Sequence, residues 1–220
     1  RKMCIRDSIW RHDLIDGRSF YLVNGNGRMF VGVEPITRGN DKATIRNFLG
    51  ALDDITPSGY GSIEGNRWEM QTLPEGSGSN AKIWTIAAQR KNPCLAFSVV
   101  GDTLKWEKIT KTPLGVTDFD PDACLSAYGR IWTAGISENP FTVFYSDLLD
   151  PTNFNSDNAG ILDISSVVGN NDTIVGMAQH NDFLVVFCKD NIVIYKGADN
   201  PDTMSLEDVI TGVGCLSMDS

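Results

Sequence analysis

The sequence predicts an all-β fold, a partial β-propeller of about four blade-like repeats of roughly 50 residues with antiparallel strands. Two observations predict it. Short β-branched and aromatic runs alternate with turn signals along the whole chain, and one long segment recurs at a fixed offset. Helical periodicity is poor. The best helix candidate is the segment 41–52, with Asp41 as its cap.

The recurring segment pairs residues 82–106 with residues 130–154. Matched residues lie 47 or 48 positions apart: Ile83-Trp84-Thr85 with Ile131-Trp132-Thr133, Asn92-Pro93 with Asn139-Pro140, Phe97-Ser98 with Tyr145-Ser146, and Asp102 and Trp106 with Asp150 and Phe154. Weaker copies begin at Arg28, 54 residues before Lys82, and at Asp182, 52 residues after Arg130. Strand-only repeats of this length are typical of propeller blades and exclude helical solenoids. A sandwich is also all-β, but it does not predict matching tryptophans at one offset.

The apolar run 183–188 is joined to the run 192–195 by a short polar turn, which indicates a hairpin with Asp190 and Asn191 in the turn. An inner strand of a propeller is covered by neighbouring sheets on both faces. Such a strand has a continuous apolar sequence in place of strict alternation. We therefore interpret this hairpin as the core of the last complete unit.

The composition of the chain excludes some classes of function. The chain has 220 residues and a net charge of −9, so a basic surface that grips nucleic acid by counterion release is not expected. No run approaches the ~20 apolar residues of a membrane helix. Residues 1–8 are interpreted as a non-native segment derived from a sequencing adapter, and residues 9–220 as one partial propeller domain, truncated at both ends.

Five scattered cysteines form no CxxC pair, so neither a zinc site nor a redox pair is predicted. Cys94 and Cys188 stand inside apolar runs, where a free thiol behaves as a small buried hydrophobe. This pattern favours a reducing compartment during synthesis.

Catalytic, cofactor and metal residues are predicted to be absent. His180 stands in a turn before a core strand, where a structural role is favoured over catalysis. Asp118, Asp120 and Asp122 imitate the start of a calcium loop, but Ala123 and Gly129 occupy the positions for its glycine and glutamate. A solvated loop between blades is the better interpretation.

Three further patterns receive structural interpretations. The sequon Asn171-Asp172-Thr173 indicates an exposed loop. Trp84, Trp106 and Trp132 recur in register, and we interpret them as blade-packing residues. Residues 97–109 loosely echo the Asp-box of sialidase-type propellers, a feature of turns that does not establish hydrolysis.

The stretch from Ala127 to Ser220 resembles the tail nozzle proteins of short-tailed bacteriophages, the tail tubular protein B and packaged-DNA stabilisation family. The resemblance rests on an ordered series: YGRIWTAG, TVFYSDLLDPTNF, GILDI, IVGMAQHNDFLVVFCKDNIVIYKG and ITGVGCLSMDS. It covers under half of the chain. Family members are much longer than this sequence.

The resemblance implies a structural virion component, made in the bacterial host cytoplasm and assembled into the phage tail. It implies a homohexamer that contacts the tail adaptor (tail tubular protein A) and tail fibres or a needle. Such a ring closes the channel, retains packaged DNA and conducts it during ejection without a cofactor. Two alternatives stay open: a sialidase-like or other glycan-acting propeller enzyme, and a generic propeller binding module.

The acidic charge suits a conduit for DNA, because carboxylates repel phosphates over roughly 8 to 10 Å at physiological salt. We therefore hypothesise that loop aspartates face a lumen or a neighbouring subunit. The candidates are Asp118, Asp120, Asp122, Asp147 and Asp150.

Overall fold

A computed structural model describes most of the chain. The described residues are 9–13, 19–25, 28–33, 53–54, 68–76, 81–89, 91–100, 103–169 and 172–216. The helix expected over 41–52 and the segment 1–8 lie outside these ranges. Within them, every helix is too short to cross a membrane.

Four antiparallel sheets of four strands each make up the fold. Blade 1 contains β1 (Ile9–Asp13), β2 (Ser19–Gly25), β3 (Arg28–Val33) and β4 (Asp53–Asp54). Blade 2 contains β5 (Glu69–Glu75), β6 (Lys82–Gln89), β7 (Asn92–Val100) and β8 (Thr103–Lys108). Blade 3 contains β9 (Ala123–Ala127), β10 (Arg130–Ala134), β11 (Thr142–Tyr145) and β12 (Gly160–Asp163). Blade 4 contains β13 (Ile174–His180), β14 (Phe183–Cys188), β15 (Asn191–Lys196) and β16 (Ser205–Thr211).

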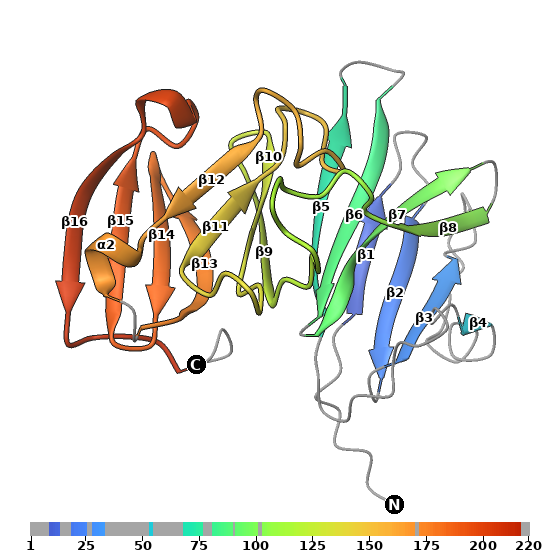
Figure 1. Cartoon of the computed structure of the whole chain (residues 1–220). Helices are drawn as coiled ribbons and strands as arrows, with labels where there is room; N and C mark the ends of the chain where they lie inside the picture. Colours follow the sequence, from blue (N-terminus) through green and yellow to red (C-terminus); the bar gives the residue numbers. More distant parts are fainter. Residues whose placement is uncertain are drawn as a thin grey trace, which may run out of the picture.

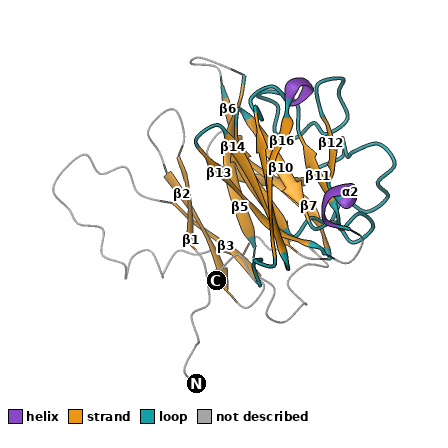
Figure 2. Cartoon of the chain, turned by 90° about the vertical axis from the view of Figure 1, so that its left-hand side faces the viewer, coloured by secondary structure: helices purple, strands orange, loops and turns teal. Residues whose placement is uncertain are grey.

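Within each blade the strands follow one another in chain order, so every blade is a simple meander. The first strands lie at the centre of the fan, because β9 contacts both β5 and β13. The fan opens from blade 1 at the right to blade 4 at the left (Figure 1). The short helix α2 (Ser165–Val168) lies to one side with the outer strands β11 and β12 (Figure 2).

Neighbouring blades bury their facing surfaces in three apolar clusters. Between blades 1 and 2 the cluster includes Phe20 and Phe97. Between blades 2 and 3 it includes Trp84 and Ile131. The third cluster joins blades 3 and 4 and is centred on Trp132, which is fully buried. The core therefore lies between sheets, as the repeat predicts.

Burial along the second strands follows the number of neighbouring blades. In β6 only the first two residues are not buried, and in β10 every residue is buried, so the expectation of cover on both faces is confirmed there. In β14 buried residues alternate with half-buried ones. One face of blade 4 therefore has no sheet against it among the described residues.

The hairpin of blade 4 is confirmed, since β14 and β15 are paired strands, but its turn consists of Lys189 and Asp190, and Asn191 already belongs to β15. The residue-level alignment with blade 3 is wrong by one position. That alignment equates Leu184 with Trp132, yet the two side chains belong to one cluster and approach it from opposite sheets. Successive side chains of a strand point to opposite faces of its sheet. Equivalent residues of two blades must therefore point to the same side of their sheets.

Two other parts of the predicted repeat are wrong. The copy at Arg28 was matched with the segment at Lys82, which is the second strand of its blade. Arg28 instead begins the third strand of blade 1, and the second strand of that blade is β2. Trp106 is 38% exposed on the outer strand β8, whereas its supposed equivalent Phe154 is buried against Phe119. Trp106 is therefore not a blade-packing residue like Trp84.

Candidate interaction surface

The central strands of blades 2 and 3 are joined by polar contacts, which we call the axial seam: Glu69, Gln71, Thr72, Cys124 and Ser126. The Ser126 amide donates to Gln71 Oε1 at 3.4 Å, and its hydroxyl donates to the Thr72 carbonyl at 3.1 Å. The Cys124 amide donates to Glu69 Oε2 at 3.3 Å. These hydrogen bonds fix the register of two strands that belong to different sheets.

The seam continues toward blade 1. Trp10 Nε1 donates to the Thr72 hydroxyl at 2.9 Å, and the Thr85 hydroxyl lies 3.1 Å from the same atom. Sequence reasoning did not identify the seam, because its residues form no motif and lie on two strands, β5 and β9, that are distant in the sequence.

Two hairpin tips meet where the central strands of blades 3 and 4 end. The Tyr128 hydroxyl donates to the Asn181 carbonyl at 3.1 Å. Burial and the nearby carboxylates of Asp182 and Asp199 raise the Tyr128 pKa. His180, Asn181 and Asp182 are exposed. We call Tyr128, His180, Asn181 and Asp182 the hairpin rim.

A strap formed by residues 146–154 ties blade 3 to blade 2. The Leu149 amide donates to the Gly129 carbonyl at 2.8 Å, and the Gly76 amide donates to the Leu149 carbonyl at 3.0 Å. Gly129 lies in the turn between β9 and β10, and Gly76 directly follows β5. The strap therefore holds hairpin ends of two blades together.

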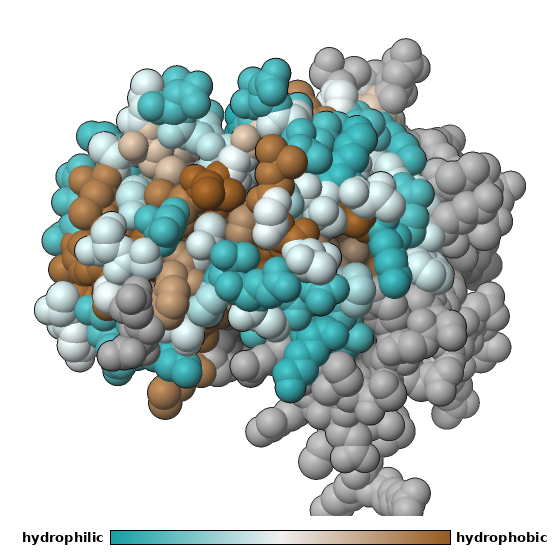
Figure 3. Space-filling model, viewed as in Figure 1, coloured by the Kyte–Doolittle hydropathy of each residue, from teal (hydrophilic) through white to brown (hydrophobic). Residues whose placement is uncertain are grey.

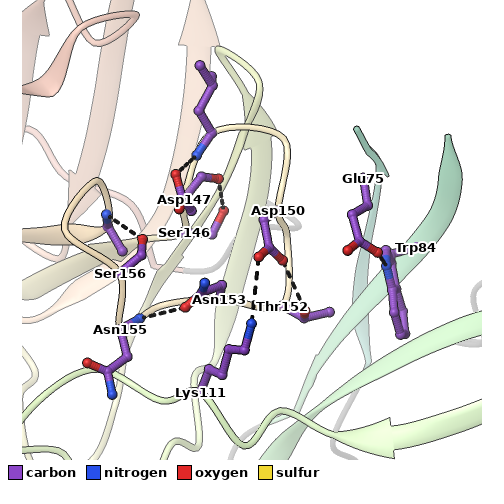
Figure 4. Close-up of polar contacts among 12 residues, drawn as sticks. Glu75, Trp84, Lys111, Ser146, Asp147, Asp150, Thr152, Asn153, Asn155 and Ser156 are labelled. Atoms are coloured by element: carbon purple, nitrogen blue, oxygen red, sulfur yellow. Dashed lines mark hydrogen bonds and ion pairs between the residues drawn. The ribbon is translucent and has the colours of Figure 1, made fainter. Parts of the chain in front are cut away.

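The strap's aspartates hold its own turns (Figure 4). Asp147 Oδ1 accepts the Leu148 amide at 2.7 Å, and Asp150 Oδ1 accepts the Thr152 hydroxyl at 3.1 Å. Lys111 Nζ lies 3.9 Å from Asp150 Oδ2 in a partly exposed ion pair. Both carboxylates therefore have structural partners within the blade that carries them.

The aspartates proposed to face a lumen do not form one group. Asp118, Asp120 and Asp122 precede β9, whereas Asp147 and Asp150 lie in the strap at the other end of that strand. Asp120 is only 8% exposed, and its two oxygens accept the Ser137 amide at 3.2 Å and the Ser137 hydroxyl at 2.7 Å. The lumen hypothesis is therefore wrong for Asp120, whose carboxylate is used inside blade 3.

Blade 4 repeats this arrangement with Asp172. Its Oδ1 accepts the Asp190 amide at 3.0 Å, and its Oδ2 accepts the Asn191 side-chain amide at 2.7 Å. Asp120 and Asp172 each stand two or three residues before the central strand and hold the turn between the second and third strands. The expectation of an exposed sequon loop is wrong for Asp172, which is 4% exposed.

Arg130 is a buried polar residue whose role sequence reasoning did not predict. Its Nη1 donates to the carbonyls of Ser146 and Asn158, both at 2.7 Å, and the guanidinium lies 5.5 Å from the Tyr145 ring centre. Arg130 therefore ties the end of β11 to the loop that follows the strap.

The thiols inside the blades are shielded from solvent. Cys94 and Cys188 are buried, as predicted, and burial raises the pKa of the Cys188 thiol to about 12. Burial also raises the Cys94 and Cys124 pKa values. His180 is exposed, and its Nε2 lies 3.4 Å from Asn181 Nδ2. Buried thiols remain protonated and unreactive at neutral pH.

Large apolar side chains also reach the surface. On the face shown in Figure 3, apolar residues interrupted by polar ones gather over blades 3 and 4. The exposed large apolar residues of the described ranges are Trp106, Leu114, Leu148, Ile161, Leu206, Ile210, Val213 and Leu216.

Comparisons with known proteins show which folds resemble that of this chain. No family model and no curated protein matches the sequence. Among solved structures, the WD40 domain of SCAP from fission yeast is similar with a TM-score of 0.51 at 8% identity. The match covers 96% of this chain and 43% of that one, so the chain spans under half of that domain's length.

Two further structures are similar at lower scores. The AfRom2 CNH domain has a TM-score of 0.38 at 11% identity, over 94% of this chain and 71% of that chain. Hsv2 from Kluyvelomyces marxianus has a TM-score of 0.31 at 8% identity, over 87% and 58%. The four-stranded meanders and the similarity to the WD40 domain identify the fold as a β-propeller, as the sequence predicts.

Proposed function

We propose that the chain is a propeller interaction module that binds a macromolecular partner and catalyses no reaction. The observation that supports this most is the use of its buried polar groups. Asp120 and Asp172 hold turns, and Arg130 holds a loop. A hydrolase needs a nucleophile and a base that converge on an open site, whereas Asp120, Asp172 and Arg130 are committed to structure.

The hairpin rim is the surface that best suits a partner. It is built on turns positioned by rigid strands, and loops on such scaffolds commonly carry binding residues. Tyr128 offers an aromatic ring whose hydroxyl is bonded to the exposed residue Asn181 and lies near the carboxylate of Asp182. Tyrosine is one of the residues enriched in interaction hot spots.

A nozzle of a phage tail is the more specific candidate, and the ordered resemblance from Ala127 to Ser220 supports it. That stretch begins at the last residue of β9, so it contains the last three strands of blade 3 and all four strands of blade 4. The net charge of −9 suits a wall that lets DNA pass without holding it. In this proposal the protein forms a homohexamer in the virion and contacts the tail adaptor and the fibres or needle.

Sequencing outward from the gene distinguishes these proposals. Portal, adaptor and capsid genes beside it support the nozzle, whereas genes for sugar catabolism contradict it and favour a glycan-acting enzyme. The non-catalytic proposal has its own test. Purified protein is assayed against a panel of aryl glycosides and sialosides, and turnover that survives repurification would contradict an interaction module.

A further inference from the structure

Arg130 is a buried cation of which the fold uses only one side. The side chain is 7% exposed. Its Nη1 donates to the carbonyls of Ser146 and Asn158, both at 2.7 Å. Its Nε is buried and has no hydrogen-bond partner among the described residues. The Nε–Nη2 edge of the guanidinium therefore keeps its capacity to donate, because both structural hydrogen bonds use Nη1.

The charge of Arg130 has no carboxylate partner in the described part of the chain, where the ion pairs join other residues. Two carbonyl oxygens and the Tyr145 ring, whose centre lies 5.5 Å from the guanidinium carbon, supply partial negative charge only. Burying a charge is costly unless it is paired and hydrogen-bonded, and native proteins leave few buried donors unsatisfied. A bound anion removes both costs.

Arg130 stands at the junction between blades 3 and 4. It lies two residues before Trp132 on β10, so both side chains are on the same face of the sheet. Trp132 packs in the cluster that joins these two blades. Burial raises the pKa of Tyr145, the Arg130 charge lowers it, and the Asp202 carboxylate raises it. Asp202 is exposed in the turn Pro201–Thr203 of blade 4, so that blade also borders the site.

We propose that Arg130 binds a carboxylate group through its Nε–Nη2 edge. This inference is independent of the proposed function. A guanidinium edge and a carboxylate form two parallel charge-assisted hydrogen bonds, a strong and directional pairing. One carboxylate balances the single charge of Arg130. A phosphate carries up to two charges and adds repulsion near Asp202 in a chain whose net charge is already −9.

The surface loop 155–158 is the expected route to this edge. It follows the strap and supplies the Asn158 carbonyl that Arg130 holds. Most of its residues are exposed, and the Ala159 amide donates to the Ser156 carbonyl at 3.1 Å within the loop itself. Segments with such local contacts open at a small free-energy cost. A carboxylate can therefore reach the guanidinium without separating the two blades.

NMR of the arginine side chains tests the proposal on the full chain. Isotope-labelled protein is titrated with sodium acetate at constant ionic strength, with sodium chloride as the balancing salt. The Nε–H of Arg130 is identified by its cross-relaxation with the Tyr145 ring. A saturable downfield shift of that proton is expected, because a charge-assisted hydrogen bond forms. Arg11 is the internal control, since its Nε already donates to Asp13 Oδ1 at 2.6 Å and its signal should stay in place.

A second titration identifies the source of the carboxylate. It uses a peptide with blocked ends and one glutamate, and the same peptide with glutamine is its control. A shift with acetate as well as with the glutamate peptide indicates a site open to free acids. A shift with the glutamate peptide alone indicates an acidic side chain of a protein partner.

Two variants sharpen the result. Acetate should raise the melting temperature of the wild type and leave that of Arg130→Lys unchanged, because lysine keeps the charge but lacks the Nε–Nη2 edge. Asp202→Asn removes a nearby like charge and should tighten acetate binding by about twofold. If Arg130→Lys fails to fold, the NMR titration of the wild type still decides.

An Arg130 signal that neither acetate nor the glutamate peptide shifts overturns the proposal. So does a shift that appears only in Asp202→Asn, because Asp202 would then be the partner of Arg130 in the wild type. An equal shift of the Arg11 signal, or a stronger response to inorganic phosphate at the same ionic strength, also contradicts a carboxylate site.

Discussion

Asp120 holds the turn at Ser137 through both carboxylate oxygens, at 3.2 Å and 2.7 Å. One blade further on, Asp172 holds the turn at Asp190 and Asn191 in the same way. In each blade the aspartate joins the segment before the first, central strand to the turn that follows the second strand. The pair is thus a repeated internal brace.

Removing either brace is expected to destabilise the fold. Asp120→Ala and Asp172→Ala each remove the acceptor of two hydrogen bonds, and each lost bond costs about 0.5–1.5 kcal/mol. Asp118→Ala is the control, because Asp118 is exposed and most such changes stay within about 0.5 kcal/mol. Urea unfolding measures the three free energies, and equal values for all three would contradict the brace.

Trp132 and Trp106, both interpreted from the sequence as blade-packing residues, are expected to differ sharply. Trp132→Ala empties a fully buried position between blades 3 and 4 and is expected to cost about 3–5 kcal/mol. Trp106→Ala acts on a side chain that is 38% exposed and costs much less. Thermal unfolding of both variants gives the comparison, and a larger loss for Trp106→Ala would be inconsistent with the packing described.

Gly135 and Gly115 offer a test of backbone geometry. Both have positive φ angles, +77° and +81°, so alanine at either position costs about 1–2 kcal/mol for the left-handed conformation. At Gly135 a new Cβ would also meet the Asp122 Cβ at 2.7 Å, whereas at Gly115 it meets nothing within 4 Å. Gly135→Ala is therefore expected to lower the unfolding free energy more than Gly115→Ala, as measured by urea titration.

Stability is expected to fall at alkaline pH. Burial raises the pKa of the Cys188 thiol from 9.0 to about 12 in the folded chain. The unfolded chain therefore loses this proton first, and the stabilisation present below pH 9.0 is lost as the pH rises toward about 12.

Cys188→Ala removes this contribution, so its unfolding free energy should change less steeply over that range than that of the wild type. Peptide-resolved alkylation supplies a control at neutral pH. Half-buried Cys215 should react before buried Cys94 and Cys188. Rapid labelling of Cys188 in the folded protein would contradict its burial.

The sequence predicted the sheets well and the residue alignment poorly. Trp84 and Trp132 revealed the repeat because both fill the same position between blades. The match of Phe97 with Tyr145 was shifted, since Phe97 and Phe144 are the residues paired with Thr85 and Thr133. A register shift in blade 2 near Ala87 changes spacing without changing the strand pattern.

The candidate surface was less predictable, because it depends on contacts between distant strands. Ser126 and Thr72 carry no recognisable motif and meet only after two sheets pack. The braces did leave a signal, since Asp120 and Asp172 are 52 residues apart, close to the repeat length. Asp120 was instead interpreted as part of a solvated loop, and sequence alone does not show that a carboxylate is buried.

A crystal structure of the full chain decides whether its sheets form a propeller fan. Four sheets are expected around β5, β9 and β13, with the Ser126 hydroxyl bound to the Thr72 carbonyl between blades 2 and 3. Two sheets packed face to face as a sandwich, with Trp84 and Trp132 in a single layer between them, would contradict it.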